Sequence, residues 1–240
     1  MKMRLTIAAL VVSALAGCGG GGSSSTPAAS NVAGFWSGTT STGRTVAAAT
    51  FQDGTIWALY TPVGNPNVIA GVVQVDGTVS GATISGSGAD YNLESRTITP
   101  GTISATINPK TSIAGSAGGV TFSGTYNADF ELTPSLSAIA GTFTGTGAAS
   151  GGTEATTVTV ASNGTLSGSS ASGCTFSGTA TPRTDGNVLN VAVTFGGGAC
   201  ANGTNTTTGI AYYDATNRQL LSAALNSAKT NGFLFTGKKP

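Results

Sequence analysis

Asp129 and Glu131 are the side chains whose types and spacing could most directly do chemistry. They stand two residues apart in the run ADFEL, so on a β-strand they would share one face about 7 Å apart, which suits acid–base catalysis or cation binding. A solvent-exposed face, with Phe130 and Leu132 turned into the core, explains the same pattern. Because no second acidic cluster supplies further oxygen ligands, we expect no metal site.

Histidine is absent from all 240 residues. Its absence removes the usual general base near pH 7, the Ser-His-Asp and Cys-His constellations and the commonest transition-metal ligand. No Gly-rich stretch follows a strand and opens a helix, as a phosphate-binding loop would. The sequence therefore predicts a protein without catalytic residues or cofactors, and an envelope glycan hydrolase that uses Asp129, Glu131 or another carboxylate pair is the catalytic alternative.

Cys18 carries a thiol that could be chemically modified, and the residues before it indicate how. Two positive charges, Lys2 and Arg4, precede a 12-residue apolar run over residues 5–16, which is too short to span a bilayer as a helix. The run ends in Leu15, Ala16, Gly17 and Cys18, which resembles the lipobox of bacterial lipoproteins. The resemblance implies that residues 1–17 are a signal peptide and that Cys18 carries acyl chains such as palmitate, which would anchor the protein to a membrane.

Residues 18–30 follow as the lipidated cysteine and a flexible linker of Gly, Ser, Thr, Ala and Pro. Glycine rather than aspartate at position 19 resembles lipoproteins that Gram-negative bacteria send to the outer membrane, although the leaflet stays open. Removing Lys2 and Arg4 leaves eight basic and nine acidic residues, a net charge of −1. That balance favours neither nucleic acid nor any other polyanion as a partner.

Cys174 and Cys200 remain as one pair in an oxidising compartment, where a disulfide is expected. The segments 174–183 and 187–195 flank Asp185-Gly186, a dipeptide typical of hairpin turns. A hairpin centred there would bring Cys174 close to residues 197–200. The spacing is not that of a redox-active Cys-x-x-Cys pair.

Beyond residue 30 the chain is a succession of short alternating runs that predict antiparallel strands. They are TIWALY (55–60), VIAGVVQV (68–75), TISATI (102–107), VTFSGTY (120–126) and TTVTV (156–160). Six Asp-Gly or Asn-Gly dipeptides punctuate the runs as turn signals, at Asp53, Asp76, Asn163, Asp185, Asn202 and Asn231. The segment 218–229 also fits a helical face, but its neighbours favour a strand. The fold class is therefore all-β.

An internal repeat suggests two similar halves. AGFWSGT at residues 33–39 resembles AGTFTGT at 140–146, and DGT at 53–55 resembles NGT at 163–165. We expect a first β-domain over residues 31–134 and a second, with the disulfide, over residues 135–240, each a small antiparallel barrel or sandwich. The boundary should lie near residues 132–137. The first half should pack on five aromatic side chains: Phe35, Trp36, Phe51, Trp57 and Phe122.

The G-x-F-x-G segments, including residues 141–145 and the closing GFLFTG, resemble barrel strands of surface lipoproteins such as transferrin-binding protein B and the factor H-binding proteins. The resemblance covers these short segments alone, and the acidic segments of those families are missing, so their ligands do not carry over. Trp36, Trp57 and Tyr60 are candidate ligand-lining residues, with the core as the alternative place for Trp57.

Together these features predict a membrane-anchored envelope lipoprotein whose β-domains bind an envelope or host macromolecule or contribute to the envelope structure. A barrel that carries a small apolar ligand, as lipocalins do, is a further alternative.

Overall fold

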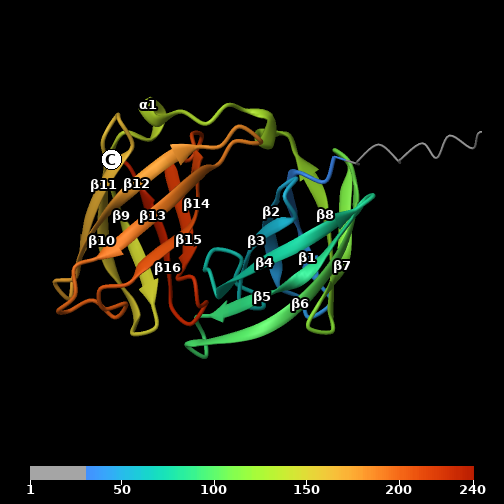
Figure 1. The fold of residues 1–240 in the computed structure, drawn as a ribbon, viewed down its shortest axis with the longest axis horizontal. Coiled ribbons are helices and arrows are strands. Elements are labelled where there is room, and N and C mark those ends of the chain that lie inside the picture. Colours follow the sequence, from blue (N-terminus) through green and yellow to red (C-terminus); the bar gives the residue numbers. More distant parts are fainter. Residues whose placement is uncertain (1–30) are drawn as a thin grey trace, which may run out of the picture.

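The computed structural model describes residues 31–240 and shows two closed antiparallel β-barrels in tandem, each of eight strands (Figure 1). The predicted all-β class and the predicted pair of similar halves are confirmed. Of the two architectures left open, both halves adopt the barrel. Cys18, the predicted signal peptide and the predicted linker lie outside the described residues.

The first barrel is an up-and-down meander in which β1 pairs with both β2 and β8, so that the sheet has no free edge. Its strands are β1 (Gly34–Thr40), β2 (Thr45–Thr50), β3 (Thr55–Tyr60), β4 (Gly71–Ser80), β5 (Thr83–Asn92), β6 (Thr97–Asn108), β7 (Ser112–Ala117) and β8 (Val120–Asn127).

The second barrel repeats this order, with β9 paired to both β10 and β16. Its strands are β9 (Gly141–Ala149), β10 (Gly152–Val160), β11 (Thr165–Ser170), β12 (Thr175–Pro182), β13 (Leu189–Phe195), β14 (Thr206–Asp214), β15 (Gln219–Leu225) and β16 (Gly232–Lys238). The strand expected within residues 218–229 is therefore confirmed as β15.

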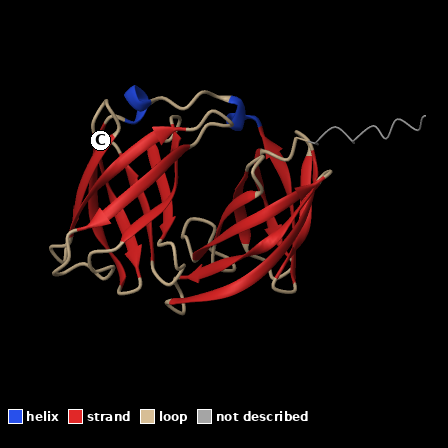
Figure 2. Ribbon diagram, viewed as in Figure 1, coloured by secondary structure: helices blue, strands red, loops and turns tan. Residues whose placement is uncertain are grey.

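Two short helices lie in the connection between the barrels, η1 (Ala128–Glu131) and α1 (Leu136–Ile139) (Figure 2). The placement of Asp129 and Glu131 on a strand is wrong, because Asn127 caps a helical turn there by accepting a hydrogen bond from the Asp129 amide. Phe130 is buried as expected, but Leu132 is exposed. Within residues 31–240, no helix is long and apolar enough to cross a membrane, these two included.

The turn signals are confirmed at five of the six dipeptides, which lie in or at the edge of connections between strands. Asp76-Gly77 is the exception, because it lies inside β4. A Cβ atom at Gly77 would come within 2.7 Å of Ile84 Cγ2 and 2.8 Å of the Gly54 carbonyl oxygen. Glycine is needed there for close approach within the strand, not for a turn.

The expected hairpin and disulfide are confirmed. Strands β12 and β13 pair from Pro182 opposite Leu189 to Phe176 opposite Phe195. Cys174 directly precedes β12 and is bonded to Cys200 in the β13–β14 connection, with the two Cα atoms 4.5 Å apart.

The two barrel interiors differ in their contents. The second is filled mainly by large side chains, including five phenylalanines: Phe143, Phe176, Phe195, Phe233 and Phe235. The first packs Trp36 among aliphatic side chains, chiefly isoleucines such as Ile84 and Ile107, at the end where the chain enters the barrel. The Trp36 indole donates a hydrogen bond to Thr50 Oγ1 at 2.8 Å, which fixes its ring.

A third apolar cluster joins the outer walls of the two barrels, and we call it the shared cluster. Its buried members are Ala33, Ala49, Phe51, Trp57, Val72, Ala89, Tyr91 and Phe130 from the first half and Ala148, Val188, Ala223, Leu225 and Leu234 from the second. The expectation that all five aromatics pack the first half's own core is therefore wrong. Trp36 and Phe122 do so, whereas Phe51, Trp57 and the half-buried Phe35 belong to the shared cluster.

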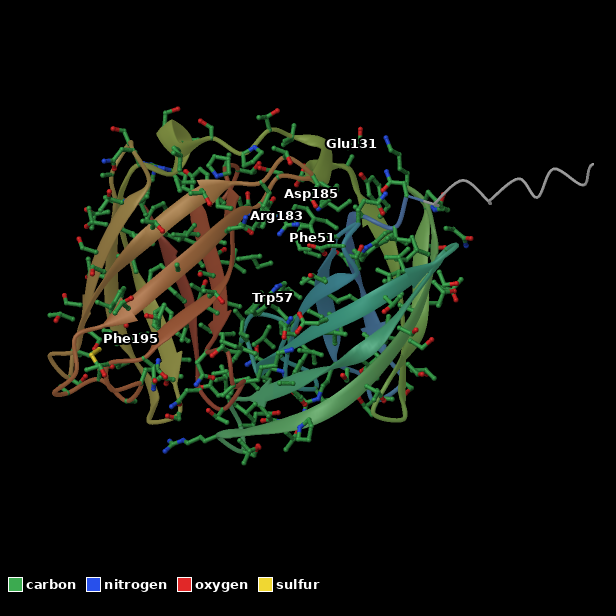
Figure 3. The ribbon with its side chains drawn as sticks, in the orientation of Figure 1. Phe51, Trp57, Glu131, Arg183, Asp185 and Phe195 are labelled. Atoms are coloured by element: carbon green, nitrogen blue, oxygen red, sulfur yellow. A yellow bond between two sulfur atoms is a disulfide. The ribbon has the colours of Figure 1, made fainter. Side chains whose placement is uncertain are left out.

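Arg183 of the second barrel contacts the first barrel at one edge of the shared cluster. Its guanidinium lies 4.0 Å from the ring centroid of Phe51 and makes two hydrogen bonds to Asp185, of 2.7 and 2.8 Å. A third contact, of 3.4 Å, reaches Asp53 of the first barrel. Figure 3 shows Arg183, Asp185 and Phe51 together between the barrels.

Replacing Arg183 should therefore weaken the interface between the two barrels. We expect Arg183→Ala to lower the free energy of unfolding by about 2–4 kcal/mol, because it removes a cation–π contact and leaves Asp185 without its cation. Urea unfolding measures the change. Lys238→Ala, which removes an exposed cation from the same barrel, is the matched control and should change little. Equal stability of the two variants would show that Arg183 does not hold the barrels together.

Candidate functional site

A cavity of about 320 Å³ occupies the first barrel. Its floor is formed by the inward side chains of Trp36, Ile56, Val75, Ile103 and Ile113. Its wall continues upward along the inward positions of the strands, which are mostly apolar. Val73 and Phe122 point into this space and are only partly buried, so the interior is accessible from outside.

Small residues at inward positions create the cavity. Above the floor the wall carries Ala48, Ala58, Gly88, Gly101 and Ala117. A Cβ atom at Gly101 would meet no other atom within 4 Å, so this glycine faces open space. An eight-stranded barrel is just wide enough to be filled by side chains or to hold one small ligand, and small residues leave the space for the ligand.

The second barrel shows the contrast, because aromatic rings cover inward glycines such as Gly168 and Gly237. A Cβ atom at Gly168 would lie 2.3 Å from Phe176 Cζ, and one at Gly237 would lie 2.4 Å from Phe235 Cζ. The same architecture is therefore closed by phenylalanine in one half and left hollow in the other.

The open end of the cavity, which we call the mouth, is bounded by turns 41–44 and 118–119 and by connections 61–70 and 93–96. Connection 61–70 exposes two apolar side chains, Val63 and Val68. Residue 31 lies at the opposite end of the barrel, because β1 runs from there toward the mouth. A ligand can thus enter at the end that faces away from residue 31.

Tyr60 and Asp90 form the polar pair of the mouth. Both project inward, Tyr60 from the last residue of β3 and Asp90 from two residues before the end of β5, and the Tyr60 hydroxyl donates a 2.7 Å hydrogen bond to Asp90 Oδ1. Burial raises the pKa of Asp90 above the usual carboxyl range, although the hydrogen bond from Tyr60 and the charge of Arg44 act the other way. Burial and the bond to Asp90 raise the pKa of Tyr60, so its hydroxyl stays protonated.

Arg44 stands beside this pair at the mouth. Its guanidinium lies 5.2 Å from the Tyr60 ring centroid and donates to Glu94 Oε2 at 2.8 Å and to the Thr61 carbonyl oxygen at 3.0 Å. These contacts hold connection 61–70 and connection 93–96 against the end of the barrel. The mouth is therefore an ordered polar rim above an apolar wall.

The structure brings two of the three candidate ligand-lining residues together. Trp36 lies at the floor of the cavity and Tyr60 at its mouth. Trp57 is not part of the lining, because it points outward from β3 into the shared cluster, between the barrels in Figure 3. Strand alternation separates Trp57 from Tyr60, since residues an odd number apart face opposite sides of a sheet.

Sequence reasoning missed Arg44, Asp90 and Gly101. A usable sign was present for Asp90, which stands at even spacing from Ile84, Gly86 and Gly88 in β5 and so faces the interior with them. A carboxylate on the inward face of a strand is unusual enough to mark a site. Arg44 and Gly101 had no comparable sign.

Asp129 and Glu131 are engaged by different residues. Glu131 bonds to Lys110 at 2.7 Å, whereas Asp129 accepts a 3.4 Å hydrogen bond from the Tyr212 hydroxyl of the second barrel. Among residues 31–240, no group of three or more His, Cys, Asp or Glu side chains is arranged to hold a metal ion.

The raised pKa of Asp90 predicts a pH effect on stability. Because the folded chain binds this proton more tightly than the unfolded chain, Asp90 contributes stability at low pH that is lost as the pH rises through its raised pKa. We therefore expect Asp90→Asn to be more stable than the parent at pH 7, with the difference vanishing as the pH falls below the usual carboxyl range. Urea unfolding from pH 3 to pH 7 measures it.

The matched control, Asp76→Asn, should behave in the opposite way. The hydrogen bond from Lys229 lowers the pKa of Asp76, so its charge stabilises the fold above the usual carboxyl pKa, and that contribution is lost on acidification. If Asp90→Asn were also less stable than the parent at pH 7, burial of the Asp90 charge would not lower the free energy of unfolding.

Known proteins give no further guide to this site. No protein-family model matches the chain, and no curated protein matches it. The cavity and its mouth are thus the features from which a function can be inferred.

Proposed function

We propose that this chain is a lipid-anchored protein of the bacterial cell envelope whose first barrel binds a small apolar ligand. The observation that carries the proposal is the 320 Å³ apolar cavity in a barrel whose twin is filled by phenylalanine. Of the alternatives considered from sequence, the barrel carrier accounts for this difference. A purely structural protein would gain stability by filling both interiors.

The size and chemistry of the cavity suit a small ligand. Ligand pockets are mostly apolar with a few polar groups that fix orientation, and their volumes begin at about 300 Å³. Here the polar groups gather at the mouth, at Arg44, Tyr60 and Asp90, and the floor is apolar. This arrangement favours a ligand with an apolar body and one polar end.

Binding rather than catalysis fits the groups at hand. Asp90 and Tyr60 face the cavity, but they bond to each other, and the chain has no histidine that could act as a general base near pH 7. The carboxylates proposed for a hydrolase, Asp129 and Glu131, are each engaged by a different residue outside the cavity.

The lipobox at residues 15–18 supports the cellular part of the proposal, with Cys18 acylated and the protein held at the outer membrane of a Gram-negative bacterium. An envelope or host macromolecule as partner is compatible with this placement.

Gly101→Leu tests the cavity as the binding site. The side chain would enter open space and fill part of the cavity, so we expect binding of an alkyl probe such as 1-decanol to weaken at least tenfold. Isothermal titration calorimetry below the solubility limit of the probe measures the affinity. Ser104→Leu, on the exposed face of the same strand, is the control and should bind like the parent. Equal binding by both variants would place the ligand elsewhere.

Cys18→Ala tests the anchor. We expect the parent to incorporate labelled palmitate and to fractionate with membranes, and the variant to lose the label, because the sulfur atom of Cys18 is the proposed acylation site. Cys174→Ala combined with Cys200→Ala controls for acylation of other cysteines and should keep the label. Label and membrane association in the Cys18→Ala protein would refute the anchor.

A further inference from the structure

Asp90 presents an oxygen atom with no partner to the mouth of the cavity. Its Oδ1 accepts the hydrogen bond from Tyr60. Within residues 31–240, no group donates a hydrogen bond to Oδ2, and no lysine or arginine forms a salt bridge with the carboxylate. Asp90 Oδ2 is not among the fully buried atoms without a partner, so it remains accessible to a donor that enters from the mouth.

Arg44 is a cation of the mouth, but its guanidinium forms its hydrogen bonds with groups other than Asp90. Its two terminal nitrogens donate to Glu94 and to the Thr61 carbonyl oxygen. The charges of Arg44 and Glu94 therefore offset each other at the rim. Arg96, in connection 93–96, forms no salt bridge with Asp90 either, so the Asp90 carboxylate has no paired cation at the place where the polar end of a bound ligand would lie.

We infer that the ligand of the first barrel is an amphiphile with a protonated amine at its polar end, whose apolar tail fills the cavity and whose ammonium group donates to Asp90 Oδ2. This inference rests on the proposed function of the cavity. An ammonium group supplies three donors and a positive charge, and charge-assisted hydrogen bonds are the strongest of their kind. An alcohol would supply a neutral donor, and a carboxylate would meet a like charge.

The cavity sets the length of the tail. Its 320 Å³ equals the space of about ten groups the size of water, which occupies about 30 Å³ in the liquid. A tail of about ten carbon atoms would therefore match the volume of the cavity. Protonated 1-decylamine, 1-decanol and decanoate share such a tail and differ in the polar end alone, so they form a matched set of probes.

Calorimetric titration of the Cys18→Ala chain with these three probes at pH 7, below their micelle concentrations, tests the inference. We expect decylammonium to bind at least tenfold more tightly than decanol, and decanoate to bind most weakly. Asp90→Asn keeps an acceptor for the Tyr60 hydroxyl and removes the charge. It should abolish the preference for the amine, so that decylammonium binds the variant no more tightly than decanol does.

Several results would overturn the inference. Decanoate binding most tightly, with loss of that binding in Arg44→Gln, would assign the polar end to Arg44 instead. An amine preference that persists in Asp90→Asn would come from elsewhere in the protein. If decanol binds and Gly101→Leu blocks it, but the amine binds no better, the carrier function stands and the amine inference fails. If none of the three probes binds, the proposed function fails with it.

Discussion

The width of an eight-stranded barrel is the constraint on which the rest of this structure depends. Once eight strands close, the interior has a fixed cross-section, and its inward side chains decide whether it is core or cavity. In the second half Phe143, Phe176 and Phe233 fill that space. In the first half Trp36 closes one end, and small residues such as Gly101 leave the other end open. One architecture thus contains a filled core in one half and a cavity in the other.

The shared cluster offsets part of the stability that the first barrel loses through its cavity. Loss of packing in one interior costs stability, because atoms that line a void lack contacts on one side. The first barrel recovers apolar burial on its outer wall, where Trp57, Val72 and Tyr91 pack against Leu225 and Leu234 of the second barrel. Packing against the filled barrel therefore stabilises the hollow one. This division explains why β3 is apolar on both faces, with Ile56 and Ala58 toward the cavity and Trp57 and Leu59 toward the shared cluster.

The electrostatics of the mouth follow from burial rather than from the number of charges. Only 8% of the residues are charged, and the net charge is close to zero. Yet Asp90 is half buried beside an apolar wall, and its hydrogen bond from Tyr60 satisfies one oxygen atom alone. One carboxylate in such a place outweighs several exposed ion pairs as a determinant of what can bind. The apolar tail would supply affinity, and Asp90 would supply orientation and selectivity.

The sequence by itself determined the strand class, the tandem halves and the disulfide, because alternation, turn dipeptides and an isolated pair of cysteines are local signals. It also suggested Trp36 and Tyr60 as residues near a ligand. Only the tertiary structure decided that Trp57 leaves the site and that Asp90 and Arg44 join it. Runs such as TIWALY bury both faces, so their composition does not tell the barrel interior from the shared cluster. The hollow in one barrel depends on how residues from eight strands converge, and no local pattern encodes that volume.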